Sequence, residues 1–184
     1  MSKENVSKIF NSDSKDKKIR LLESLVNSDD LEIISKIISK LDDSDIEVRG
    51  EAFSSLVLNE NNISNQLIQN LKSENKNIRG FSALVLANRR NLEAISEIIF
   101  LTKDQSGMVR ACALGALGYL KANQASKEIH ECFSDSNMEV KKSALKAALD
   151  IGDVISSEEI MELSKETDTE IEKLLIQAKV NSNV

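Results

Sequence analysis

Residues 104–118 read DQSGMVRACALGALG, and their central pair, Val109-Arg110, belongs to a pattern that extends along the whole chain. A β-branched aliphatic residue followed by a basic residue recurs as Ile19-Arg20, Val48-Arg49, Ile78-Arg79, Val109-Arg110 and Val140-Lys141, and Ile171-Glu172 continues the series without the base. Successive aliphatic positions are separated by 29, 30, 31, 31 and 31 residues. A nearly fixed period in this range is typical of a stack of small, similar structural units.

Each aliphatic-basic pair is preceded by a residue suited to begin a helix. Three positions before the aliphatic residue stand, in order, Asp16, Asp45, Asn75, Ser106, Asn137 and Asp168. Side-chain oxygens of these types accept the free N–H groups of a first helical turn. Apolar or small residues follow four and eight positions after the aliphatic residue and form one ridge of a helix. The pattern therefore predicts that each pair opens the second helix of its repeat.

A second apolar stripe lies upstream of each pair and predicts the first helix of the repeat. Its members eleven positions before the aliphatic residue are Ile37, Leu67, Ile98, Ile129 and Ile160. Short polar turns separate the two stripes, and the chain contains no Pro. We expect an all-α, right-handed α-solenoid (superhelix) of about six helical hairpins in one domain, residues 1–184. The predicted repeats are 1–28, 29–59, 60–89, 90–121, 122–153 and 154–184.

The segments 104–118, 43–56 and 135–149 resemble HEAT repeats, and are most similar to the short repeats of phycobilisome lyases. The resemblance covers essentially the whole chain. It implies that the second helices line a concave surface that faces a protein partner. It also implies a ladder between repeats, in which the Arg at the start of the second helix meets an Asp before it. Asp43, Asp104 and Asp135 match that Asp, whereas Ser73 departs from it, so we expect a weaker joint there.

Composition narrows the classes of partner. The formal net charge is −6, from 24 basic and 30 acidic side chains, and phosphate binding needs an excess of bases. No apolar run approaches about 18 residues, and the N-terminal residues lack the apolar core of a signal peptide. The two cysteines are too few for a disulfide framework. We therefore predict a cytoplasmic protein that binds neither nucleic acid nor membrane.

The basic column offers the first candidate site. Four of the six Arg residues belong to it, and its candidate contact residues are Arg49, Arg79, Arg110 and Lys141. Two interpretations remain open, a hydrogen-bonded ladder between repeats and a stripe that binds anions, and one residue can serve both. Arg89-Arg90, after the third repeat's second helix, is interpreted as a solvated basic spot.

A second candidate site lies on the second helices of repeats three and four. Arg110 is the only charged residue from Ser106 to Leu120. The residues outside the packed columns include Phe81, Leu84, Cys112 and Tyr119, which we predict to contact a partner. Gly118 also lies outside the packed columns, and small residues at Gly80, Ala111 and Gly115 would leave a groove with Phe81 and Tyr119 as anchors. The alternative is that these small residues allow neighbouring helices to pack closely.

Neither catalysis nor cofactor binding is predicted. His130, the single histidine, falls in a column that holds Ile or Met in other repeats, so we expect it to pack between helices. Cys112 has no second histidine to act as its base. Cys112, His130 and Cys132 lack the spacing of a zinc site. We expect no catalytic residue, no metal and no cofactor.

The sequence thus predicts a non-enzymatic scaffold or adaptor that binds an acidic or mixed amphipathic segment of a protein partner. One alternative is an accessory factor, similar to a lyase or chaperone, that handles a tetrapyrrole or another small ligand. A second alternative is a structural subunit of a larger complex, bound through the first helices. The sequence leaves the partner and the oligomeric state open.

Overall fold

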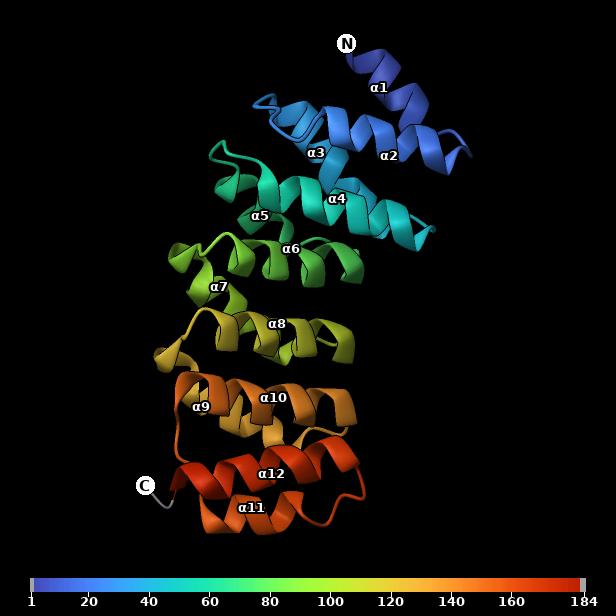
Figure 1. The fold of residues 1–184 in the computed structure, drawn as a ribbon. Helices are drawn as coiled ribbons and strands as arrows, with labels where there is room; N and C mark the ends of the chain where they lie inside the picture. The colour runs from blue at the N-terminus through green and yellow to red at the C-terminus, as the bar shows by residue number, and fades with distance from the viewer. Residues whose placement is uncertain (1, 183–184) are drawn as a thin grey trace. The chain divides into compact units, whose positions relative to one another are not determined.

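The computed structural model describes residues 2–182, and within this range every regular element is a helix. The chain divides into two compact units, Met1–Asn91 and Leu92–Val184, each built from three helical hairpins (Figure 1). The all-α fold of repeated hairpins is therefore confirmed. The single domain predicted over residues 1–184 stays a prediction.

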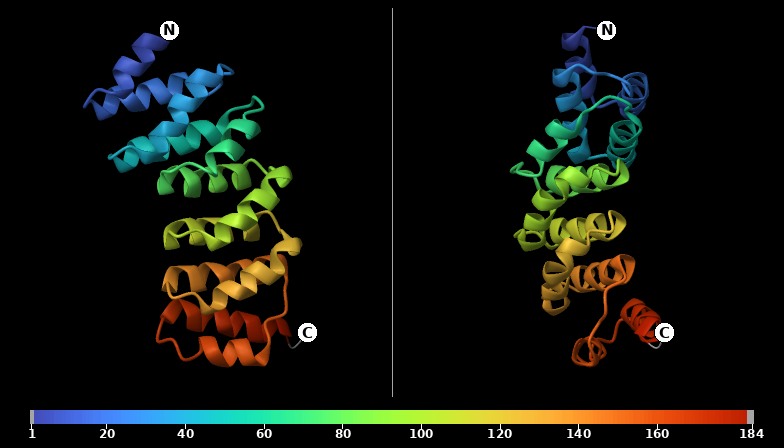
Figure 2. Two further views of the ribbon diagram at one scale, coloured as in Figure 1. Left: turned by 180° about the vertical axis from the view of Figure 1, so that it is seen from behind. Right: turned by 90° about the vertical axis from the view of Figure 1, so that its left-hand side faces the viewer.

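The first unit contains the hairpins of the first three predicted repeats. Its helices are α1 (Lys3–Phe10), α2 (Lys15–Ser24), α3 (Leu31–Ser39), α4 (Ile46–Leu58), α5 (Ser64–Asn70) and α6 (Lys76–Asn88). The 3₁₀ turn η1 (Lys40–Asp42) extends α3. The second helices α2, α4 and α6 follow one another in one layer, and α3 and α5 pack behind them (Figures 1 and 2).

The second unit repeats this arrangement. Its α-helices are α7 (Ile95–Phe100), α8 (Gly107–Tyr119), α9 (Ser126–Glu131), α10 (Met138–Ile151), α11 (Ser157–Leu163) and α12 (Thr169–Ser182). The 3₁₀ turns η2 (Leu92–Ala94), η3 (Leu101–Lys103), η4 (Asn123–Ala125) and η5 (Cys132–Ser134) lengthen α7 and α9 at both ends. Helix α10 packs between α8 and α12.

The capping pattern read from the sequence is largely confirmed. Asp45, Asn75, Asn137 and Asp168 each accept two backbone N–H groups of the first helical turn. Ser106 occupies the N-cap position of α8 without a side-chain hydrogen bond. The prediction for Asp16 is wrong, because α2 begins at Lys15 and Ser14 is its N-cap. Asp16 instead places its charge in the first turn, where the helix dipole favours it.

The predicted apolar columns form the core. Val48, Ala52 and Leu56 on α4 are fully buried, as are their counterparts Val109, Ala113 and Leu117 on α8. Of the first-helix stripe, Ile37, Leu67, Ile98 and Ile129 are buried, whereas Ile160 is half-buried. None of the helices in the described range is both long enough and apolar enough to cross a membrane.

Candidate functional site

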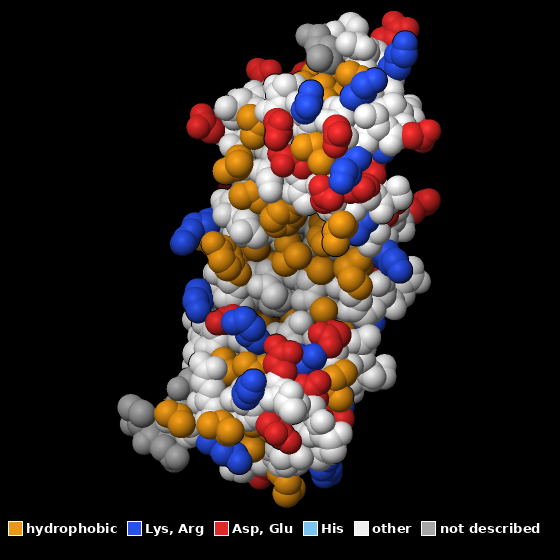
Figure 3. Space-filling model, turned by 45° about the vertical axis from the view of Figure 1, so that its right-hand side comes forward, with side chains coloured by type: hydrophobic (Ala, Val, Ile, Leu, Met, Phe, Trp, Pro, Cys, Tyr) orange, Lys and Arg blue, Asp and Glu red, His pale blue; other side chains and the backbone are white. Residues whose placement is uncertain are grey.

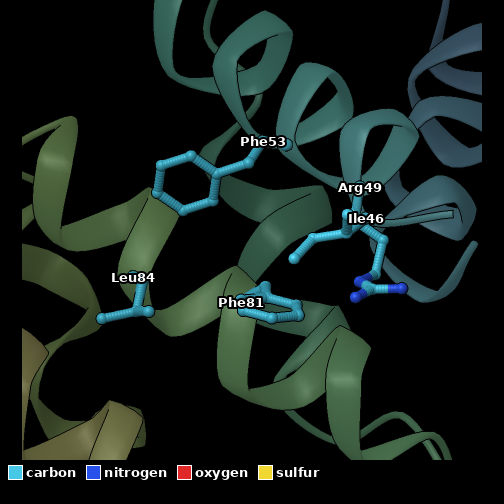
Figure 4. A pocket seen from close by; sticks show the side chains of 6 residues that line it. Ile46, Arg49, Phe53, Phe81 and Leu84 are labelled. Atoms are coloured by element: carbon cyan, nitrogen blue, oxygen red, sulfur yellow. The ribbon is translucent and has the colours of Figure 1, made fainter.

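An apolar pocket of about 380 Å³ opens between α4 and α6 in the first unit. It is lined by Ile46, Arg49, Gly50, Phe53, Phe81 and Leu84. Figure 4 shows Phe53 and Leu84 at one end of the pocket, Arg49 and Ile46 at the other, and Phe81 between them. The volume falls within the range of known ligand pockets, and Arg49 is the only charged residue among the six.

Helical spacing brings these side chains to one surface. Ile46, Gly50 and Phe53 are separated by four and three residues, so they share one face of α4. Phe81 and Leu84 are three residues apart on α6. The sequence predicted Arg49, Phe81 and Leu84 but missed Ile46, Gly50 and Phe53. Their helical spacing was a usable signal, because three non-core residues of one helix fall on one face.

The large apolar side chains that line the pocket are partly exposed to solvent. Ile46 is 72% exposed, although its neighbour Val48 is fully buried. Phe53, Phe81 and Leu84 are half-buried. In Figure 3, hydrophobic side chains gather over α4 and α6. A cluster of exposed apolar side chains is a common property of interaction sites, whereas isolated ones are ordinary.

Gly50 contributes space to the pocket. A Cβ atom added to Gly50 would meet no atom within 4 Å, and the residue is exposed. Glycine in a helix interior is unfavourable relative to alanine by about 0.8–1 kcal/mol. Neither a close packing contact nor a left-handed backbone conformation requires glycine at this position.

Arg49 binds the turn that precedes its own helix. Its Nη1 donates to the carbonyl oxygens of Asp43 at 2.7 Å and Ser44 at 3.1 Å. Arg79 repeats this contact with Ser73 at 2.7 Å and Glu74 at 2.9 Å, and Arg110 repeats it with Asp104 at 2.8 Å. The basic column therefore has a structural role in satisfying turn carbonyls. Arg79 is only 7% exposed, so most of its side chain is not on the surface.

The predicted ladder between repeats is present in the second unit. The Nε and Nη2 atoms of Arg110 each lie 2.7 Å from a carboxylate oxygen of Asp135. Lys141 forms an ion pair with Glu166, the residue that continues the same acidic column. Because the guanidinium of Arg110 donates hydrogen bonds to it, the pKa of Asp135 lies below its ordinary value.

In the first unit the ladder differs from the expected form. The carboxylate of Asp43 accepts Lys18 Nζ at 2.9 Å, and Arg20 is exposed. Asp43 loses solvation by burial, but the Lys18 and backbone hydrogen bonds outweigh this loss and lower its pKa overall. Lysine at position 18 thus replaces arginine at position 20 in the contact with the next repeat.

Comparison with known proteins finds likeness in structure only. No protein-family model matches the sequence, and no curated protein matches it significantly. The complex of CpcE and CpcF of phycocyanin lyase from Nostoc sp. PCC7120 aligns with a TM-score of 0.66 at 17% identity, over 82% of this chain and 99% of that chain. A designed armadillo repeat protein in complex with the peptide (KR)4 aligns at 0.57 and 17% identity, over 96% and 98%. A structure concerning TOG-tubulin binding specificity aligns at 0.54 and 14% identity, over 96% and 82%.

The chain has a HEAT- or armadillo-like repeat fold. The aliphatic-basic pair is the sequence feature that first indicated this repeat fold. In this fold the second helix of each hairpin begins with the pair. The aliphatic member enters the core, except for the half-buried Ile19 and Ile78, and Arg49, Arg79 and Arg110 bind the preceding turn.

The predicted groove residues of these HEAT-like repeats divide between the two units. Phe81 and Leu84 line the pocket of the first unit, whereas Gly80 is buried. In the second unit Tyr119 is 52% exposed, Gly115 is exposed, and Ala111 and Cys112 are half-buried. A groove that joins both sets of residues stays a prediction.

Gly118 follows the alternative interpretation of close packing. A Cβ atom on it would lie 3.0 Å from the Cα atom of Ala147 on α10. This glycine therefore allows α8 and α10 to approach each other, and it is not part of an exposed groove.

The two thiols are poorly suited to act as nucleophiles. Burial raises the pKa of both Cys112 and Cys132 to about 11, so both remain protonated at neutral pH. The sulfur of Cys112 lies 3.6 Å from the sulfur of Met108. Among residues 2–182, no three His, Cys, Asp or Glu side chains are grouped as metal ligands would be.

His130 lies between hairpins, as expected, but its contacts are mainly polar. Its Nδ1 lies 2.6 Å from Glu159 Oε1, and its Nε2 lies 3.3 Å from Asp153 Oδ2. The ring also packs against Phe133, with centroids 4.7 Å apart. The aliphatic residues in the same column gave no signal for these carboxylates, because Asp153 lies in the connection after α10 and Glu159 lies on α11.

The interpretation of Arg89 as solvated is wrong. From the end of α6 its guanidinium donates to the carbonyl oxygens of Leu56 at 3.0 Å, Val57 at 3.3 Å and Asn61 at 2.8 Å, and also to that of Asn59. It thereby caps the C-terminus of α4, whose last carbonyls lack helical partners. Burial lowers the pKa of Arg89 from its ordinary value. Arg90 is exposed.

Proposed function

We propose that this chain is a non-enzymatic scaffold that binds a segment of a protein partner in the pocket between α4 and α6. The observation that carries the proposal is the pocket itself, where two Phe rings, Leu84 and the exposed Ile46 surround about 380 Å³. Aromatic residues and Arg are enriched in protein-protein interfaces. One large apolar side chain buried in such a pocket contributes about 1.5–3 kcal/mol to binding.

The structural neighbours support a binding role without identifying a partner. One is a complex of two proteins, and another is a designed repeat protein with a bound peptide. A repeat fold of this kind can present a surface to a binding partner, but the fold alone does not determine function. We further propose that the protein acts in the cytoplasm. We also propose that it catalyses no reaction, in keeping with the protonated thiols and the single histidine.

The test begins with selection of binders from a library of short random peptides on the full-length chain. Affinities of the selected peptides are then measured by fluorescence polarisation for the wild type, Leu84→Ala and Gly50→Leu. Leu84→Ala removes a pocket wall, and Gly50→Leu adds a side chain where an added Cβ meets no atom within 4 Å. We expect each change to weaken binding by at least about tenfold, the equivalent of roughly 1.4 kcal/mol.

Two controls separate pocket binding from general loss of structure. Phe100→Ala removes an aromatic ring that is 77% exposed and lies outside the pocket, so affinity should remain unchanged. Far-UV circular dichroism and thermal unfolding establish that each variant is folded. Failure to select any peptide, or equal affinity for wild type and both pocket variants, would contradict the proposed function.

A tetrapyrrole accessory role is the second candidate, and the likeness to the CpcE and CpcF complex is the observation in its favour. Titration with a bile pigment, followed by absorption spectroscopy, tests it directly. A Cys112-dependent covalent adduct would support this role, whereas the raised pKa of the Cys112 thiol argues against its acting as a nucleophile. If the wild type binds the pigment, Gly50→Leu does not, and no peptide binds the wild type, the tetrapyrrole role would be favoured over the scaffold proposal.

A further inference from the structure

The acidic residue of the ladder performs two tasks where it is present. Asp135 accepts the backbone N–H of Asn137 at 2.8 Å through Oδ1, which shapes the turn before α10. The same carboxylate accepts Nη2 and Nε of Arg110, the first through Oδ1 and the second through Oδ2, each at 2.7 Å. The side chains of Arg110 and Asp135 are only 16% and 12% exposed, so the pair is well shielded from water.

Between α4 and α6 the corresponding residue is Ser73, five positions before Ile78. Its hydroxyl accepts the backbone N–H of Asn75 at 3.2 Å, so serine retains the first task. Serine carries no negative charge and cannot perform the second. The turn before α6 is therefore preserved, whereas the anionic partner for the preceding arginine is missing.

Arg49 is the arginine that this substitution leaves without an acid. Its Nη1 donates to two carbonyl oxygens of its own turn, as Nη1 of Arg110 does. In the part of the chain that the structure describes, no carboxylate pairs with Arg49, and its Nε and Nη2 have no hydrogen-bond partner. These are the two atoms through which Arg110 holds Asp135.

The same arginine lines the apolar pocket, beside Ile46 (Figure 4). A guanidinium with one free edge, next to a pocket for bulky side chains, is complementary to a carboxylate that stands beside an apolar group. The fork geometry of Arg suits a carboxylate in particular.

We propose that Arg49 is a receptor for an acidic residue of the bound partner, and that this carboxylate occupies the place that Asp135 takes opposite Arg110. The occupant is a peptide segment of another protein in which Asp or Glu lies within a few residues of a Leu, Ile, Met or Phe side chain. The large side chain enters the pocket between Phe53, Phe81 and Leu84. This inference rests on the proposed function and specifies the partner's chemistry.

Restoring the missing acid provides the test. In Ser73→Asp, one carboxylate oxygen accepts the N–H of Asn75, as Asp135 accepts that of Asn137, and the other binds Arg49. The variant should unfold at a higher temperature than the wild type. It should also bind an acidic-apolar peptide about five- to tenfold more weakly, because Arg49 is already engaged.

Ser73→Asn is the matched control. It has the size of Asp and can accept the N–H of Asn75, but it brings no charge to Arg49. We expect its peptide affinity to remain close to that of the wild type. A loss of affinity equal to that of Ser73→Asp would show that size at position 73 matters and would overturn the proposal.

The peptides provide the complementary comparison. Sequences selected on the wild type should be enriched in an acidic residue near an apolar one, and replacing that Glu by Gln should reduce affinity for the wild type but not for Arg49→Gln. Equal binding of the Glu and Gln peptides by the wild type, or unchanged affinity of Ser73→Asp, would overturn the role of Arg49. If Gly50→Leu still abolishes binding in that case, the pocket function stands and only its acidic specificity fails.

Discussion

Replacement of Gly50 by Ala should stabilise the protein. Gly50 is the fifth residue of the 13-residue helix α4, well inside its hydrogen-bonded interior. Its backbone is not left-handed, and an added Cβ atom would meet no atom within 4 Å. The substitution therefore gains helix propensity without steric strain, and we expect an increase of about 0.8–1 kcal/mol in the free energy of unfolding.

Urea unfolding followed by far-UV circular dichroism measures this gain, provided that the slope with denaturant is unchanged. For a chain of this length the same gain corresponds to a rise in melting temperature of about 2–4 °C. Gly118→Ala is the matched control, because its Cβ would lie 3.0 Å from Ala147 Cα and 3.2 Å from Asp150 Oδ2. Forcing α8 and α10 apart costs about 1–3 kcal/mol, which exceeds the gain in propensity.

The two glycines thus test opposite explanations for the same residue type. If Gly50→Ala were no more stable than the wild type, the space around Gly50 would be filled by something that the structure does not show. If Gly118→Ala were stabilised to the same extent, the close approach of α8 and α10 would be wrong.

The remaining predictions concern the polar contacts and the thiols. Arg89→Met should lower the unfolding free energy by about 2 kcal/mol because it leaves carbonyls at the end of α4 without a donor, whereas exposed Arg90→Met should change it by less than about 0.5 kcal/mol; chemical denaturation compares the two. Asp135→Asn should cost about 2 kcal/mol at neutral pH. Because Arg110 lowers the pKa of Asp135 in the folded state, the pair stabilises the fold above the ordinary carboxyl pKa, and its contribution is lost as the pH falls through the lowered value. The free energy of unfolding, measured from neutral to strongly acidic pH, should therefore fall less steeply for Asp135→Asn than for the wild type. Equal pH dependence of the two proteins would contradict the ion pair. Cys112 should react with iodoacetamide at least about tenfold more slowly than free cysteine at mildly alkaline pH, because burial raises its pKa to about 11; a rapid reaction, followed by mass spectrometry with Cys112→Ser as reference, would instead favour the lyase-like alternative.

The fold was predictable because the repeat imposes the same physical demands several times. An N-cap, a buried aliphatic residue and a small residue four positions later recur together, and each recurrence reduces the chance that the pattern is accidental. The first hairpin was the exception at its cap. There the N-cap is Ser14, five positions before Ile19 and not three, so α2 begins two residues earlier than the repeat pattern predicts.

The candidate site was only half predictable. Phe81 and Leu84 stood out because their helix departs from the packed columns, but the opposite wall on α4 was overlooked. Phe53 and Ile46 lie on a helix that also carries Glu47 and Glu51. Because these charged residues alternate with the apolar ones along the sequence, the exposed apolar face was not recognised. Which faces of two helices meet depends on the angle at which the hairpins pack, and residue spacing does not supply that angle.

Under the proposal that Arg49 binds an acidic residue of a partner, the two interpretations of the basic column become one mechanism with different partners. Nη1 of Arg49, Arg79 and Arg110 binds the turn carbonyls, so each of these three arginines is positioned by its own repeat before it meets anything else. What the remaining edge binds then depends on a single residue about 25 positions later. Where that residue is Asp135, the guanidinium joins two repeats. Where it is Ser73, an arginine held in the same way lies beside an apolar pocket. We therefore propose the departure from the repeat, and not the repeat itself, as the place where a partner binds.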